Sequence, residues 1–258
     1  RKILTACLQQ VEHVYCPLAE EALVTKVRHI MATLQTKERS GVQVASSLND
    51  SADLLHEMRL IKDKTEIAHL RQAAQVTQQG FERMMQTISP GMMEYQLEAE
   101  FLYALNHQGV RQVAYPSIVA GGKNACVLHY TANDASLNAG DLVLVDAGAE
   151  YARYAADVTR TFPVNGKFLP HQRDLYNAVL AVQTKAIAAV KPGVSLQELN
   201  QLAAKEMVKQ LLALGLLQGD PKILLQEAAY RQFFMHGLGH WLGLDVHDVG
   251  AVKVQAQS

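Results

Sequence analysis

The chain has 258 residues, of which 49% are hydrophobic and 19% charged, a composition typical of a soluble globular protein with one large core or two domains. Its 24 Lys and Arg residues nearly balance its 25 Asp and Glu residues, so the net charge of −1 argues against nucleic acid or an anionic membrane surface as a partner. No stretch approaches about 18 uninterrupted apolar residues, which argues against a membrane-spanning helix.

The cysteines and the start of the chain bear on the redox state and the cellular location of the protein. Cys7, Cys16 and Cys126 are too few and too irregularly spaced for a disulfide framework or a zinc cluster, so we expect a reduced, cytoplasmic protein. The sequence turns polar by Gln9, which is not typical of a signal peptide. It also lacks an initiator Met, and we expect it to be a fragment of a longer protein.

Residues 1–60 contain no chemical motif. Apolar residues at helical spacing predict a helix over 19–34, and the pattern predicts a short strand over 41–45 and a loop over 47–51. The character of the chain changes at Lys62, after which Thr65 is a candidate N-cap for a long helix.

Two pairs of helices, each interrupted by Pro-Gly, lie one after the other in the sequence. The breaks are Pro90-Gly91 and Pro192-Gly193, and their similar surroundings suggest an internal duplication. The alternative is two helical hairpins that are similar by chance, because Pro-Gly is a common helix stop. The predicted helices cover residues 65–89, 97–109, 173–190 and 196–215.

A block rich in strands follows the first helical pair. A matching block should follow the second pair, but too few residues remain after Gly215, so we expect the chain to stop inside its second sheet. The predicted strands are 117–120, 126–128, 141–154 and 155–164, with a turn near Gly148–Glu150.

Two aspartates in this block are candidates for chemistry. Asp146 ends the apolar run 142–145, where a carboxylate is costly unless it is paired, hydrogen-bonded or bound to a metal. If the chain folds back near residues 150–152, Asp157 comes close to Asp146, and a divalent cation would relieve their repulsion. The alternative is structural: Asp146 caps a turn before Gly148, and Asp157 pairs with Arg160.

The histidines form a second candidate group. His236, His240 and His247 fall within one Gly-rich stretch, and Gly237 and Gly239 argue for a strand or loop there rather than a helix. Such a cluster is typical of metal binding or proton transfer, although each histidine could also be structural. His129 lies outside the cluster and is the weaker candidate.

Several separated stretches are recognisable together. They are Tyr115–Gly122, Asn124–Tyr130, Leu144–Gly148, Asp157–Pro163, His236–His240 and Val246–Asp248. In this order they resemble the pita-bread metallopeptidases, which include methionine aminopeptidase, aminopeptidase P and prolidase. The stretches over 115–130 are most similar to aminopeptidase P, the Xaa-Pro aminopeptidase. The match covers residues 60 to 250 or so and rests on several motifs that agree.

The resemblance implies a fold and a domain organisation. The fold is an α+β pita-bread domain with duplicated helix-helix-sheet halves, of which the second is truncated. We expect this domain over residues 61–258, and residues 1–60 resemble the end of the N-terminal α/β domain of these enzymes, with a linker helix. The tail 251–258 departs from the Gly- and Arg-containing continuation expected for the family.

The resemblance also implies site residues and a cofactor. Asp146, Asp157 and His240 match three of the family's five metal ligands, and the resemblance implies that these ligands hold two divalent manganese ions. His129, His236 and His247 match its substrate-handling histidines. The other two ligands are glutamates on later strands, beyond the end of this sequence.

The implied activity is removal of the N-terminal residue from peptides with proline second, by a homo-oligomeric protein, dimer or tetramer. Three alternatives stay open: an Xaa-Pro dipeptidase (prolidase), a metal-free creatinase, and a non-catalytic pita-bread binding module. Retention of Asp146, Asp157 and His240 argues against creatinase. Because two ligands and the general base are absent, we expect this chain alone to be a poor catalyst.

Overall fold

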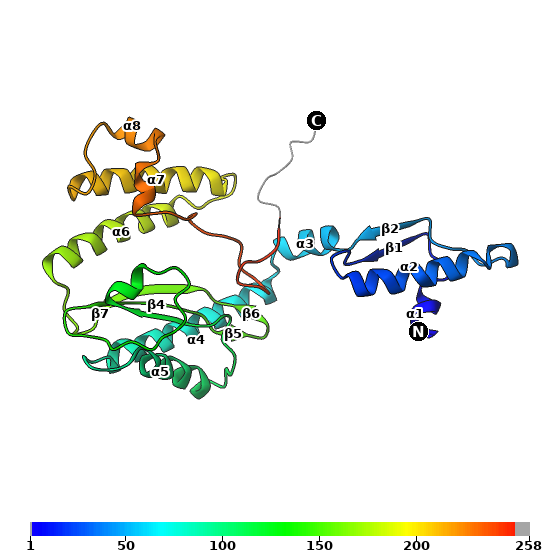
Figure 1. Ribbon diagram of the computed structural model, residues 1–258, viewed down its shortest axis with the longest axis horizontal. Coiled ribbons are helices and arrows are strands. Elements are labelled where there is room, and N and C mark those ends of the chain that lie inside the picture. Colours follow the sequence, from blue (N-terminus) through cyan, green and yellow to red (C-terminus); the bar gives the residue numbers. More distant parts are fainter. Residues whose placement is uncertain (1, 251–258) are drawn as a thin grey trace. The chain divides into compact units, whose positions relative to one another are not determined.

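The computed structural model describes residues 2–250, which form two units (Figure 1). One unit comprises residues 2–61 with 249–250, and the other comprises residues 62–248. This division lies beside the predicted boundary, whereas the assignment of residues 1–60 to a larger N-terminal domain stays a prediction. The tail 251–258 lies outside the described residues. None of the described helices is long and apolar enough to cross a membrane.

The first unit is a small β-α-β arrangement. Strands β1 (His13–Cys16) and β2 (Ser47–Asp50) are parallel and are connected through α2 (Glu21–Gln35). The inner face of α2 carries Val27, Ile30 and Leu34 into the core, as the apolar spacing predicted. The remaining elements are α1 (Lys2–Cys7), η1 (Glu38–Ser40) and α3 (Ala52–Leu60).

The strand prediction in this unit was wrong by several residues. Residues 41–45 form only an isolated bridge, Val44 to Gln9, and the strand lies at Ser47–Asp50, where we predicted a loop. Polar residues adopt the extended form there because they pair along β1, and β pairing depends on the partner more than on intrinsic preference.

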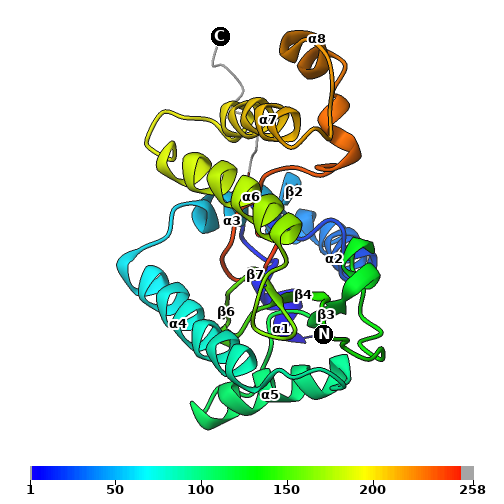
Figure 2. The same ribbon diagram turned by 90° about the vertical axis from the view of Figure 1, so that its left-hand side faces the viewer.

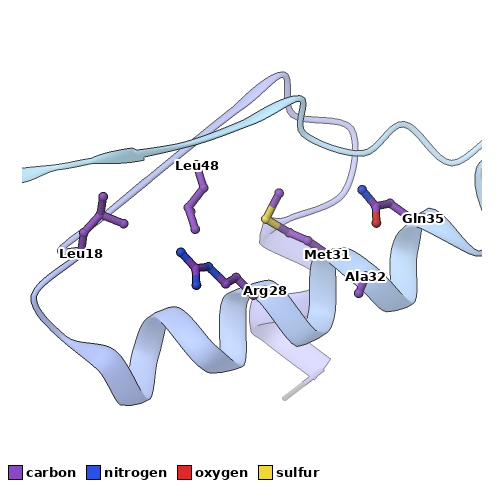
Figure 3. A pocket seen from close by; sticks show the side chains of 6 residues that line it. All are labelled: Leu18, Arg28, Met31, Ala32, Gln35 and Leu48. Atoms are coloured by element: carbon purple, nitrogen blue, oxygen red, sulfur yellow. The ribbon is translucent and has the colours of Figure 1, made fainter.

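A pocket of about 280 Å³ lies between α2 and the start of β2 (Figure 3). It contains one charged side chain, Arg28, among mostly apolar neighbours. Its lining residues are Leu18, Arg28, Met31, Ala32, Gln35 and Leu48. None of them is a candidate catalytic or metal-binding residue.

The second unit is built on an antiparallel sheet. Its strand order is β3 (Ile118–Gly121), β4 (Leu142–Ala147) and β7 (Val158–Pro163), with a small hairpin of β5 (Glu150–Tyr151) and β6 (Tyr154–Ala155) between β4 and β7. Helices α4 (Lys64–Thr87) and α5 (Glu94–His107) pack together against this sheet. Their shared core contains Phe81, Met84, Leu97, Phe101, Val119, Val143 and Val145.

The second helical pair has a core of its own. Helices α6 (Pro170–Ala188) and α7 (Leu196–Ala213) pack with α8 (Pro221–Gln226) around Val182, Val208 and Leu211. Both views place this group across the sheet from α4 and α5 (Figures 1 and 2). The four long helices thus confirm the predicted helical segments. After Gly215, however, the described residues contain no strand: they form α8, η3 (Ala229–Gln232) and an irregular segment.

Three local predictions in the second unit were wrong. The N-cap of α4 is Asp63, not Thr65, because the Asp63 carboxylate accepts hydrogen bonds from two backbone N–H groups and Glu66 completes a capping box. Residues 126–128 are not a strand: η2 (Gly122–Cys126) includes the first of them, and Val127 and Leu128 are exposed. Neither long strand over 141–164 is continuous: the first is broken at residues 148–149 and 152–153, and the second at residues 156–157.

Gly148 allows a close approach that a side chain would prevent. A Cβ atom there would overlap the carbonyl oxygen of Ala156, the residue before Asp157. We predict that Gly148→Ala lowers the free energy of unfolding by about 2–3 kcal/mol, because backbone must move to relieve the overlap. Gly239→Ala is the control, since nothing lies within 4 Å of its added Cβ, and its effect should stay within about 0.5 kcal/mol. Urea denaturation measures both, and equal losses would contradict the prediction.

Candidate active site

The sheet brings Asp146 and Asp157 to one phenol. Asp146 lies in β4 opposite Thr159, and Asp157 immediately precedes β7. The hydroxyl of Tyr115 lies 2.5 Å from Oδ1 of Asp146 and 3.0 Å from Oδ1 of Asp157. A phenol has one proton, so it donates to one carboxylate at a time. The pair of carboxylates therefore keeps a negative charge that Tyr115 cannot fully compensate.

Burial adds to this unfavourable charge. It raises the pKa of the Asp146 carboxyl above its usual range, and the nearby Asp157 carboxylate raises it further. Burial and the hydrogen bond to Asp146 together raise the pKa of Tyr115, which therefore stays a protonated donor. Tyr115 was not among the predicted site residues. The sequence pointed to Tyr115 only as the first residue of the recognisable stretch 115–122, and it did not show that the hydroxyl reaches both aspartates.

His240 faces one of these carboxylates, that of Asp157. Its Nδ1 lies 2.9 Å from the carbonyl oxygen of Trp241, and a carbonyl only accepts, so Nδ1 carries the proton. In the neutral imidazole, Nε2 then has a lone pair, and this atom lies 3.2 Å from Oδ2 of Asp157. Two acceptors so close are favourable only with a proton or a cation between them. The ring of His240 also contacts that of His247, with centroids 4.1 Å apart.

A pocket of about 420 Å³ opens beside the aspartates. Both aspartates and two of the predicted histidines, His129 and His247, line it. The other lining residues are Ala114, Tyr115, Pro116, Ile118, Thr131 and Val246. A cavity lined by apolar side chains with a few convergent polar groups is the usual form of a small-ligand site.

Neither His236 nor His240 lines this pocket, and His236, unlike His240, makes no contact with the aspartates within the described residues. His236 is exposed, its ring packs against Phe234 at 5.4 Å, and its Nδ1 lies 2.8 Å from the Gly237 carbonyl oxygen. The alternative prediction of an ion pair between Asp157 and Arg160 was wrong. The Arg160 guanidinium donates instead to the carbonyl oxygen of Thr159.

The candidate ligands meet in pairs. Asp146 and Asp157 share Tyr115, and His240 contacts Asp157. Within residues 2–250, no three His, Cys, Asp or Glu side chains form a group that could hold a metal ion. The donor types nevertheless suit a divalent cation, since carboxylate oxygens and a neutral imidazole nitrogen are its ordinary protein ligands.

The segment that carries the histidines has no regular structure and is held at separated points. The N–H of Leu238 donates to Asn200 on α7, and the carbonyl of Gly243 accepts from the N–H of Ala155 in β6. Asp248, next to His247, is 2.9 Å from the ammonium of Lys62, and both side chains are almost buried. These contacts fix His240 and His247 against the sheet in place of a helix or strand.

Comparison with known proteins identifies the family. The model of metallopeptidase family M24 matches residues 68–257. The chain belongs to this family. It is 52% identical over 206 residues to the Xaa-Pro aminopeptidase of Haemophilus influenzae, covering 80% of this chain and 48% of that protein. Identity to the Xaa-Pro aminopeptidase of Escherichia coli is 45% over 224 residues, covering 87% and 51%.

Solved structures of family relatives have the same fold. Proline aminopeptidase P II from Yersinia pestis matches with a TM-score of 0.92 at 45% identity, over 97% of this chain and 58% of that one. A zinc-substituted E. coli aminopeptidase P in complex with product matches with a TM-score of 0.93 at 42% identity, over 97% and 57%. The predicted family and the pita-bread fold class are confirmed. The chain spans about half the length of the curated M24 relatives it matches.

The ion pair of Lys62 and Asp248 generates a local prediction. We expect Lys62→Met to release the end of the histidine segment, because it removes the ammonium from a carboxylate that is only 1% exposed. The chain has one tryptophan, Trp241, whose carbonyl accepts from the N–H of Asp248, so its fluorescence reports on this segment directly. Acrylamide quenching of Trp241 should increase by about two- to threefold, and stability should fall by about 2–4 kcal/mol.

Lys64→Met is the matched control, since Lys64 is exposed at the start of α4. It should leave quenching unchanged and stability within about 0.5 kcal/mol. Unchanged quenching in the Lys62 variant would show that the ion pair does not hold the segment.

Proposed function

We propose that this chain is the part of an Xaa-Pro aminopeptidase that carries Asp146, Asp157 and His240 as metal ligands, and that the whole protein removes the first residue from peptides with proline second. The observation that carries the proposal is the convergence of both aspartates and His240 beside a pocket lined by His129 and His247. The Xaa-Pro aminopeptidases among the M24 relatives support the substrate class.

The electrostatics of the site favour a cation. Two carboxylates share one phenolic proton, one of them is partly buried, and Nε2 of His240 lies 3.2 Å from the other. Positive charge at this point would relieve the repulsion between the carboxylates and the cost of burying Asp146. We propose that Asp146, Asp157 and His240 would hold two divalent ions, manganese by resemblance, with Asp157 contributing to both ions, Asp146 to one and His240 to the other. When bound, such ions polarise the scissile carbonyl and lower the pKa of a water.

The residues of the chain have separate proposed roles. His129 and His247 line the pocket, and each can donate a ring N–H to a substrate carbonyl oxygen as this oxygen gains charge. Tyr115 holds the two aspartates in register through its hydroxyl. His236 lies outside the pocket lining, so its proposed contact with substrate requires a shift of the segment around it. Cytoplasmic location is proposed from the few, irregularly spaced cysteines, and a homo-oligomeric state from the resemblance alone.

A non-catalytic binding module is the second candidate. The observation that favours it is that within residues 2–250 no three candidate ligands form a metal-holding group. Such a module would keep the peptide pocket with its histidines but would not turn substrate over. The two candidates differ in turnover and not in fold.

The decisive assay compares substrates on the complete gene product that contains this chain, with excess Mn²⁺. We predict release of the first residue from Xaa-Pro-Xaa peptides at a kcat/KM at least about 100-fold above that for Xaa-Ala-Xaa peptides. Preference for Xaa-Pro dipeptides would indicate a prolidase instead. Equal cleavage of both tripeptides would refute the proposal, and no turnover would favour the binding module. The 258-residue chain, assayed beside it, is predicted to be a poor catalyst.

The ligand roles predict different metal contents. Asp157→Ala should abolish most Mn²⁺ binding to the gene product, because it removes the carboxylate proposed to contact both ions. His129→Ala should retain the metal, because His129 lines the pocket and, within the described residues, makes no hydrogen bond to either aspartate. Elemental analysis after gel filtration measures both. If the His129 variant loses as much metal as the Asp157 variant, the assigned roles are wrong.

A further inference from the structure

Glu94 is a buried carboxylate that lies outside the pocket lining. It is the first residue of α5, and its side chain is 0% exposed. Its Oε1 accepts from the N–H of Gly121 at 2.7 Å and from Nδ2 of Asn124 at 3.1 Å. Its Oε2 accepts from the hydroxyl of Tyr130 at 2.7 Å and from the N–H of Ala135 at 3.0 Å. The buried charge is thus compensated by four donors.

All four donors belong to one segment. Residues 121–135 leave β3, form the short η2 turn and then continue without regular structure to the return toward β4. The donors lie at the start, in the middle and at the end of this segment, and Glu94 is therefore its central anchor. His129, between two of these donors, lines the pocket beside the aspartates.

The backbone at His129 needs such an anchor. Its φ is +55°, in the left-handed backbone region that residues other than glycine rarely adopt. A residue stays in this region only where its surroundings fix it. The next residue, Tyr130, is fixed by its bond to Glu94, and this bond raises the pKa of Tyr130 to about 12, so the phenol remains a donor near neutral pH.

A second contact of α5 acts on the same segment. Asn133 is buried, its Nδ2 donates to Glu98 and to the carbonyl oxygen of Ser117, and its Oδ1 accepts from the N–H of Val119. This contact fixes the end of the segment to β3. The stretch from Gly121 to Tyr130 is held by its hydrogen bonds to Glu94.

We propose that Glu94 is a positioning residue that holds residues 121–135 so that His129 faces the peptide pocket, and that it thereby sets substrate affinity and not metal binding. The part that concerns substrate rests on the proposed function. A carboxylate is required because each of its two oxygens accepts two of the four hydrogen bonds. The amide of Gln has only one oxygen, so its NH₂ group would face two of the donors and could accept from neither.

The first measurement does not depend on activity. Hydrogen exchange of the 258-residue chain is followed by mass spectrometry in Glu94→Gln and in Glu100→Gln. The latter is the matched control, because Glu100 is on the same helix but pairs with Arg83 and not with the segment. We expect peptides over 119–137 to exchange about tenfold faster or more in Glu94→Gln, with α6 and α7 unchanged, and no such change in the control. Unchanged exchange in Glu94→Gln would overturn the proposal.

The second measurement separates positioning from general destabilisation. In the gene product, Glu94→Gln should raise KM for an Xaa-Pro-Xaa peptide about tenfold, with smaller change in kcat and unchanged Mn²⁺ content. Faster exchange with unchanged KM, or loss of metal, would overturn the link to His129. If Glu94→Gln does not fold, Tyr130→Phe removes one of the four bonds and should change both quantities in the same direction. Absence of any Xaa-Pro activity would refute the proposed function, and the exchange result would still decide whether Glu94 holds the segment.

Discussion

The repulsion between Asp146 and Asp157 is the constraint on which the site depends. Antiparallel pairing of β4 with β7 brings the two carboxylates together, and Tyr115 supplies a single proton between them. Such an arrangement does not by itself favour the fold, because burial makes the charge of Asp146 more costly. A proton or a metal cation relieves the repulsion, and this electrostatic demand links the geometry of the sheet to the metallopeptidase family of the chain.

The side chains around this pair are supplied by segments without regular structure. His129 lies on residues 121–135, which are anchored by Glu94, and His247 lies on a segment anchored by Lys62. Both anchors are nearly buried charged groups that join residues far apart in sequence. Helices and sheet thus fix the aspartates directly, whereas charged hydrogen bonds fix the histidines. Loops placed by a rigid scaffold are the usual carriers of binding residues.

The sequence predicted the parts of the molecule whose signals are local. The four long helices followed from apolar periodicity and Pro-Gly breaks, and the turn after β4 followed from Gly148. It failed where partners far away decide the outcome. Ser47–Asp50 is a strand because β1 pairs with it, and residues 126–128 form the end of η2 and a turn in a segment that is hydrogen-bonded to the distant Glu94. Tyr115 and Glu94 were missed as site residues for the same reason, since no spacing reveals which side chains a hydroxyl or carboxylate will reach.

Charge balance also indicates how the two helical halves would contribute to one site. The first half supplies both aspartates from its sheet, and the segment after the second helical pair supplies His240 and His247. Two divalent ions carry four positive charges and repel each other, so a dinuclear site needs more anionic ligands than two carboxylates and a neutral imidazole. Within the described residues the candidate metal ligands meet only in pairs, which is consistent with a shortage of anionic ligands. Under the proposed function, further carboxylates must therefore come from outside the described residues, and the longer relatives have the chain length to supply them.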